Sequence, residues 1–168
     1  MSLRRTPLTR KTPLRNRSGI TPRKAALNQR AVKAARRPRR DTGPTAEVKE
    51  IVSARAVGCC ELCSTRLRSA GRWIADHSFH HRRPRGMGGT TRSQSNGPAN
   101  LLLLCGTGTT GCHGRIEANR TEAYERGWLV GQVEDPREVP VDISIFGASY
   151  GLERVLLDDE GGHRKAEA

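Results

Sequence analysis

The chain has 168 residues, enough for one domain of ordinary size with appendages. Its formal net charge is +13, and residues 1–40 hold 14 Lys and Arg but no Asp or Glu, whereas residues 41–168 hold the other 16 against all 17 acidic residues. No apolar run approaches the ~20 residues of a membrane span and no hydrophobic leader core is present, so we exclude a membrane-spanning protein and expect a cytoplasmic one.

The first predicted segment, residues 1–43, is a basic arm. "TPL" recurs at Thr6–Leu8 and Thr12–Leu14, and regular proline with unbroken positive charge opposes a packed core. We expect the arm to be disordered in isolation and to bind a polyanion, most simply DNA, with a solubilising tail as the alternative. The candidate DNA contacts in the arm are Arg4, Arg5, Arg10, Lys11, Arg15 and Arg17.

The remaining chain predicts short helices and strands in alternation. A helix is expected over Ala46–Val57, closed by Gly58, and a second over Cys112–Gly127. The expected strands are Arg72–Asp76, Ser78–His81, Asn100–Cys105, Trp128–Val130 and Arg154–Leu157, with fraying from about Gly161. Around the histidines the order is therefore strand, loop, strand, helix, a ββα arrangement.

Five cysteines make a metal site the first expectation, because clustered thiols in a reducing compartment more often bind metal than pair. Cys60 and Cys63 form C-x2-C, a spacing that directs two thiolates at one tetrahedral ion. Cys105 and Cys112 are candidates for the second pair of a zinc-ribbon-like site, although six residues separate them. Cys59 is an alternative to Cys60, and ordinary buried thiols are the alternative to a structural zinc site.

The stretch "FHHRRPRGMGG" places two adjacent histidines before a glycine-rich loop. A hydrolytic nuclease needs a base for water and a cation for the phosphate, and His80, His81 and His113 are suited to both tasks. Glu117 lies one helical turn beyond His113. The amide of Asn100 is expected to bind backbone groups and hold the histidine loop.

Together, "HHRRPRGMGG", "NLLLLC" and "CHGRIEAN" resemble the HNH endonuclease motif, in its cysteine-bearing subgroup of phage and bacterial proteins. The resemblance covers about Cys60 to Gly127. It implies an α+β fold, a small ββα-metal finger with a zinc-ribbon-like cysteine cluster behind the disordered arm. The nuclease domain would span residues 44–127, followed by a small β extension over residues 128–168.

In that resemblance His81 is the general base and Asn100 the middle asparagine. His80 and His113 are ligands of a divalent catalytic metal, Mg²⁺ or a transition metal. Glu117 is a candidate third ligand, with a surface glutamate paired to arginine as its alternative. A competing register starting at Asp76 fits less well, because it lacks proline and Gly-Gly at the expected offsets.

The implied activity is metal-dependent hydrolysis of DNA, by nicking or double-strand cleavage. Arg82, Arg83 and Arg85 are expected to clamp phosphates beside the site. The resemblance also implies a phage or prophage origin, hence the host cytoplasm, and a link to DNA packaging with a terminase or other packaging protein as partner. The alternative function is a non-catalytic, zinc-stapled DNA-binding adaptor.

Overall fold

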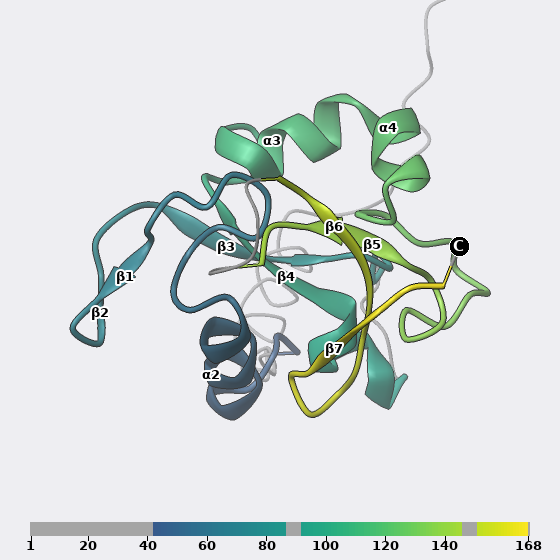
Figure 1. Ribbon diagram of the computed structural model, residues 1–168, viewed down its shortest axis with the longest axis horizontal. Helices are drawn as coiled ribbons and strands as arrows, with labels where there is room; N and C mark the ends of the chain where they lie inside the picture. The colour runs from purple at the N-terminus through teal and green to yellow at the C-terminus, as the bar shows by residue number, and fades with distance from the viewer. Residues whose placement is uncertain (1–41, 87–91, 146–150, 168) are drawn as a thin grey trace, which may run out of the picture. The chain divides into compact units, whose positions relative to one another are not determined.

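The computed structural model describes residues 42–86, 92–145 and 151–167, which form an α+β fold of short helices and small antiparallel sheets (Figure 1). Residues 1–41 of the basic arm lie outside the described residues. In chain order the elements are α2 Ala46–Arg55, β1 Arg68–Ser69, β2 Arg72–Trp73, β3 His77–His81, the 3₁₀ turns η1 Ser93–Asn96 and η2 Pro98–Asn100, β4 Leu101–Cys105, α3 Gly111–Ala118, α4 Arg120–Glu125, β5 Val141–Ile143, β6 Glu153–Leu157 and β7 His163–Lys165. Among the described residues, no helix has the length and apolar character that a bilayer crossing requires.

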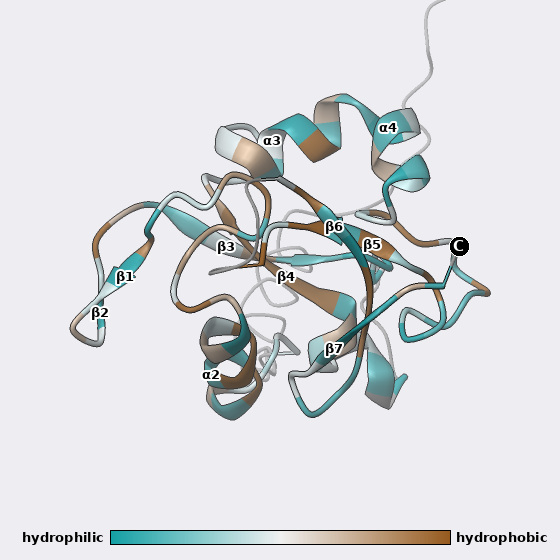
Figure 2. Cartoon of the chain, viewed as in Figure 1, coloured by the Kyte–Doolittle hydropathy of each residue, from teal (hydrophilic) through white to brown (hydrophobic). Residues whose placement is uncertain are grey.

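Strand β4 lies at the centre of the fold. Its four leucines are fully buried, and Figure 2 shows it as a hydrophobic strand. Both α2 and α3 contact β4, and they lie on opposite sides of it in the view of Figure 1. A strand covered on both faces needs apolar side chains in succession rather than in alternation, which explains the run LLLL and confirms the predicted strand.

β4 pairs with β3 in an antiparallel register that runs from His77 opposite Cys105 to His81 opposite Leu101. The predicted strand at the histidines is thus confirmed. The register places the histidine pair at the start of β4 and the cysteine at its end.

A single hydrophobic cluster surrounds β4. It includes Val52 from α2, Ile116 from α3, and Val141 and Val155 from the last sheet. Trp128 and Leu129 belong to the same cluster. Residues after 127, which the sequence suggested as a small extension, therefore contribute to the same core as the histidine and cysteine elements.

Helix α2 begins at an N-cap, Thr45, whose hydroxyl accepts a hydrogen bond from the backbone N–H of Val48 at 3.3 Å. The chain leaves the helix through Gly58, which has a φ of 68°. A Cβ at Gly58 would lie 3.0 Å from the Cβ of Arg68, so glycine also permits the close approach of the next segment. The predicted helix and its closing glycine are confirmed.

The predicted single helix over Cys112–Gly127 is wrong, because the chain forms two helices that meet at Asn119. The backbone of Asn119 has φ −127° and ψ 71°, outside the helical region. Its carbonyl accepts from Ala123 in the first turn of α4, and its side-chain amide donates to Glu122 at 3.1 Å. Asparagine has a lower helix propensity than the residues on either side of it, and its side chain bonds Glu122 without capping the backbone N–H groups of α4.

Two further predictions about the C-terminal part are wrong. Trp128–Val130 forms a buried bend and no strand. The backbone N–H of Leu129 donates to the carbonyl of Ala123, and that of Val130 donates to the carbonyl of Arg82. The chain beyond Gly161 forms β7, which pairs with β6 from Val155 opposite Lys165 to Leu157 opposite His163. β7 is an edge strand with exposed polar side chains, so hydrophobicity gave no signal for it.

Candidate functional site

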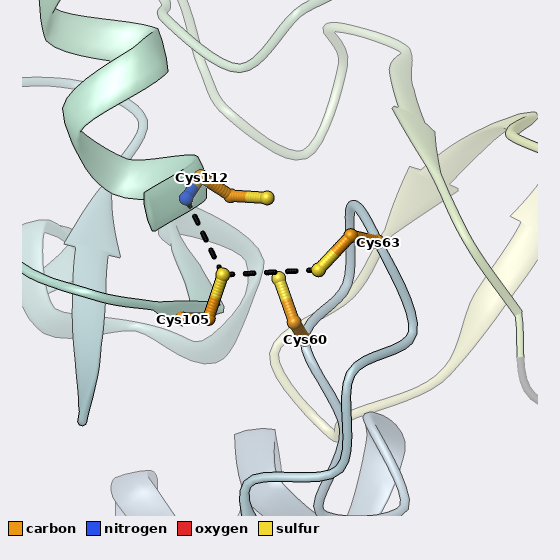
Figure 3. Close-up of side chains that lie close together, drawn as sticks. All are labelled: Cys60, Cys63, Cys105 and Cys112. Atoms are coloured by element: carbon orange, nitrogen blue, oxygen red, sulfur yellow. Dashed lines mark hydrogen bonds between the residues drawn. The ribbon is translucent and has the colours of Figure 1, made fainter. Parts of the chain in front are cut away.

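Four of the five cysteines meet at one place (Figure 3). Cys60 and Cys63 lie in the loop after α2, Cys105 ends β4, and Cys112 lies in the first turn of α3. Their four sulfur atoms all lie within 4.8 Å of one another, and the sulfurs of Cys63 and Cys105 are 3.7 Å apart. The cysteines are free thiols, so the cluster can hold a metal ion.

The structure decides between the neighbouring cysteines Cys59 and Cys60. Both are buried, but the Cys59 thiol donates to the carbonyl of Val57 at 3.7 Å and does not belong to the cluster. Cys60 is therefore the residue whose sulfur faces the other three.

A tight turn closes the six-residue gap between Cys105 and Cys112. Gly106 and Gly111 have φ of 80° and 61°, and a Cβ on Gly106 would lie 2.2 Å from the carbonyl oxygen of Thr110. Only glycine fits such a position. The backbone N–H of Cys112 consequently reaches the sulfur of Cys105 at 3.3 Å.

The thiols differ in acidity. Burial raises the pKa of Cys60 to about 12 and also raises that of Cys112, with the charge of Cys60 adding to the effect. For Cys63 burial acts upward too, but hydrogen bonds from Thr65 and from the other cysteines outweigh it and lower its pKa to about 7. Collecting four thiolates in this space is unfavourable without a cation, and a divalent ion would remove that penalty.

A second group of metal-ligating side chains lies at the junction of β3 and α3. Ligand atoms of His80, His113 and Glu117 all lie within 4.8 Å of one another, and the two imidazole rings meet edge to face with centroids 4.9 Å apart. Glu117 also pairs with Arg120 at 3.1 Å. Its carboxylate therefore lies both near the two histidines and beside an arginine, the two alternatives that the sequence offered.

Hydrogen bonds orient the two imidazoles of this group. Nε2 of His80 lies 3.0 Å from the carbonyl oxygen of Trp128, which can only accept, so Nε2 carries the proton and Nδ1 keeps a lone pair. Nδ1 of His113 bonds the hydroxyl of Ser78 at 2.8 Å, and its Nε2 lies 3.9 Å from Glu117. One nitrogen of each ring is thus held by the protein while the other is available to a metal, the usual arrangement for metal-binding histidine.

Burial lowers the pKa of both histidines. It brings that of His80 to about 4, and it also lowers the pKa of His113, where the charge of Glu117 opposes the effect. Both rings are therefore neutral near pH 7, as a metal ligand must be.

His81 lies outside the metal-ligating group and directly follows its member His80 in β3. Its Nε2 is 3.0 Å from the side-chain oxygen of Asn96 in η1. Burial lowers its pKa against the opposing hydrogen bond to Asn96, and the charges of Arg85 and His113 lower it further. A neutral, half-buried imidazole of this kind is suited to accept a proton.

Asn100 is buried and joins the histidine strand to the loop that follows it. Its side-chain oxygen accepts from the backbone N–H of Arg83 at 2.7 Å, and its amide donates to Ser95 at 2.8 Å. Its own carbonyl accepts from the N–H of Arg82. The expectation that this amide binds backbone groups and holds the loop is confirmed.

The prediction that Arg82 and Arg83 contact DNA is wrong, because both are enclosed by protein, with 0% and 5% exposure. Arg83 donates to the carbonyl of Glu134 at 2.8 Å. The Arg82 guanidinium donates to four backbone carbonyls, those of Ala99, Gly127, Pro136 and Val139. Burial lowers the pKa of Arg82 to about 9, with the charge of Arg55 adding to the effect and Glu61 opposing it.

The third arginine of the predicted clamp, Arg85, is half-buried and donates to the carbonyl of Thr42. The candidate DNA contacts of the arm, and Gly88–Gly89 of the motif, lie outside the described residues. Within the described residues, the predicted arginine clamp is thus reduced to Arg85.

Replacing Arg82 by alanine is expected to destabilise the protein by about 3 kcal/mol or more, because four buried carbonyls lose their donor. Urea unfolding followed by circular dichroism measures the change. The control is Arg72→Ala on exposed β2, for which about 0.5 kcal/mol or less is expected. Equal unfolding midpoints for the two variants would show that Arg82 is not a structural residue.

Some site residues were missed by sequence reasoning. Ser78 lies two positions before His80 and so shares its face of β3, a signal that strand alternation offered. Asn96 and the carbonyl of Trp128 had no such signal, because loop contacts bring them to the histidines.

No protein-family model matches the chain, and comparison with curated proteins finds no match.

Proposed function

We propose that the protein is a metal-dependent endonuclease of the HNH type that hydrolyses phosphodiester bonds of DNA. One observation carries the proposal: His80, His113 and Glu117 bring their ligand atoms within 4.8 Å of one another, and His81, whose pKa is lowered by burial, directly follows His80 in β3. The succession of β3, β4 and α3, with a buried asparagine before β4, supports a ββα-metal interpretation.

The metal-binding part of the proposed site consists of His80 and His113, with Glu117 as third ligand. A divalent ion held there, Mg²⁺ or a transition metal, would stabilise charge on the scissile phosphate and on the departing 3′ oxygen. The chain's own contribution is to fix both imidazoles, through Trp128 for one and Ser78 for the other, and to keep them neutral by burial.

His81 is the proposed general base. It takes a proton from a water molecule, whose oxygen attacks phosphorus while the bond from phosphorus to the 3′ oxygen breaks. The released 3′ oxygen takes up a proton from solvent, which leaves 5′-phosphate and 3′-hydroxyl ends. Asn100 supports this step indirectly, because it holds the backbone that follows His81.

The four-cysteine cluster is the proposed site of a structural Zn²⁺. Four thiolates from separate segments suit the tetrahedral coordination and the soft character of that ion. The cluster joins the loop after α2, the end of β4 and the start of α3. A metal at this place would add directly to the stability of the fold.

Deleting residues 1–40 is expected to reduce the salt dependence of DNA binding, since log K falls by about 0.9 per neutralised phosphate for each unit of log salt. Fluorescence anisotropy with a labelled duplex at several salt concentrations gives this slope. The control keeps the charge and changes the six candidate arm contacts from Arg to Lys or Lys to Arg, which should leave the slope unchanged. An unaltered slope in the deletion variant would show that the arm does not touch DNA.

The burial of Arg82 and Arg83 favours a second candidate, a zinc-stapled DNA-binding adaptor without catalysis, because it removes two predicted phosphate contacts from the site. A plasmid relaxation assay with Mg²⁺, Mn²⁺ or Ni²⁺ against EDTA separates the two. Metal-dependent nicking or linearisation supports the nuclease, whereas plasmid binding without cleavage supports the adaptor.

Phage or prophage origin and a terminase or other packaging partner stay predictions from the resemblance.

A further inference from the structure

We infer that Asn96 is a positioning residue that holds His81 in one orientation and one tautomer. The inference rests on the proposed function for its catalytic consequence, and on geometry alone for the contact itself. Asn96 ends η1, fifteen residues after His81, and its side chain lies between the imidazole and the backbone of Thr42 and Gly43.

The surroundings of Asn96 determine which end of its amide faces the histidine. The amide nitrogen lies 2.9 Å from the carbonyl oxygen of Thr42 and 3.3 Å from that of Gly43. Carbonyl oxygens only accept, so the donor end of the amide must face them. The amide oxygen is thereby turned towards His81.

That oxygen decides the tautomer of His81. It lies 3.0 Å from Nε2 and can only accept, so Nε2 carries the proton of the neutral ring. Nδ1 then has a lone pair and, within the described residues, no hydrogen-bond partner. The nitrogen available to take a proton from water is therefore Nδ1, and the reversed tautomer would leave no base on that side of the ring.

The backbone carbonyl that Asn96 binds has a second hydrogen-bond donor. The carbonyl of Thr42 accepts from Arg85 as well as from Asn96. Thr42 and Gly43 are also the last two residues of the predicted basic arm. The orientation of the proposed base thus depends on the backbone carbonyls of Thr42 and Gly43, at the C-terminal end of that arm.

Nitrogen-15 NMR of the histidine side chains in the full chain, at a pH above the titration range of imidazole, reads the tautomer directly. We expect the proton of His81 on Nε2 in the wild type. Asn96→Asp keeps an acceptor for Nε2 but loses the donor to Thr42 and Gly43, so Nε2–H should stay the main tautomer there with a smaller excess. We expect a mixture of tautomers in Asn96→Leu, which is similar in size but has no acceptor. A proton on Nδ1 in the wild type, or an unchanged spectrum in Asn96→Leu, overturns the inference.

Cleavage kinetics complete the test. Asn96→Leu should lower the maximal cleavage rate about 10- to 100-fold, the usual effect of removing a group that orients a functional histidine, with DNA affinity unchanged. Asn96→Asp, which keeps the acceptor but loses the bonds to Thr42 and Gly43, should have a rate between those of the wild type and Asn96→Leu, and Gln94→Ala in the same turn is the control. Wild-type cleavage by Asn96→Leu despite a lost tautomer refutes the positioning role. If the wild type cuts no DNA with any metal, the proposed function fails, while the spectra still decide the contact.

Discussion

Replacement of Cys60 by serine is expected to abolish metal binding at the cysteine cluster and to remove much of the stability of the fold. Cys60 is buried within the hydrophobic cluster, and its sulfur is one of four that share the space for an ion. A structural zinc contributes on the order of 10 kcal/mol of folding free energy, comparable to the whole stability of a typical domain. We therefore expect the melting temperature to fall by more than about 10 °C.

Cys59 provides a matched control for this experiment. It is the adjacent residue, it is buried, and its thiol faces the carbonyl of Val57 rather than the cluster. Metal analysis by mass spectrometry should find one ion at the cluster in Cys59→Ser and none in Cys60→Ser. Thermal unfolding should separate the two variants in the same order. Equal metal content in both would mean that the cluster does not bind a metal.

Replacement of His81 by alanine is expected to lower the rate of DNA cleavage by roughly 10²-fold or more, because the attacking water loses its base. The metal-ligating group of His80, His113 and Glu117 does not include this side chain, so metal affinity should change little. Plasmid relaxation under single-turnover conditions measures the rate, and calorimetric titration measures the metal.

His77→Ala is the matched control. His77 lies four positions earlier on the same strand, its ring stacks on Trp73 at 3.6 Å between centroids, and it is not part of the metal-ligating group. Its loss should leave the cleavage rate within a few-fold of the wild type, on the order of surface substitutions in general. Near-wild-type cleavage by His81→Ala would remove His81 from the proposed mechanism.

The sequence was most informative where one local signal determined the structure. The apolar run of β4 and the capped, glycine-closed helix α2 follow from short-range patterns, and both were predicted correctly. The C-x2-C spacing likewise indicated half of the cysteine cluster. The closing turn between Cys105 and Cys112 could be recognised only in three dimensions, because its two glycines act through positive φ.

The arginines show the limit of that reasoning. Arg82 and Arg83 look like surface residues in a basic loop, but their partners lie 17 to 57 residues away in the sequence. No local pattern indicates that carbonyls from so many segments will converge on one guanidinium. The ion pair between Arg55 and Glu61, with 2.8 Å between its atoms, is buried between α2 and β4. It likewise had no local signal in the sequence.

Cys112 and His113 are consecutive residues in the first turn of α3, yet they belong to different metal-ligating groups. A single peptide unit thus separates the two candidate ion sites. Under the proposed function, an ion at the cysteine cluster would help to hold the backbone that carries His113. Loss of the ion at the cysteine cluster would then also weaken metal binding at the histidine site.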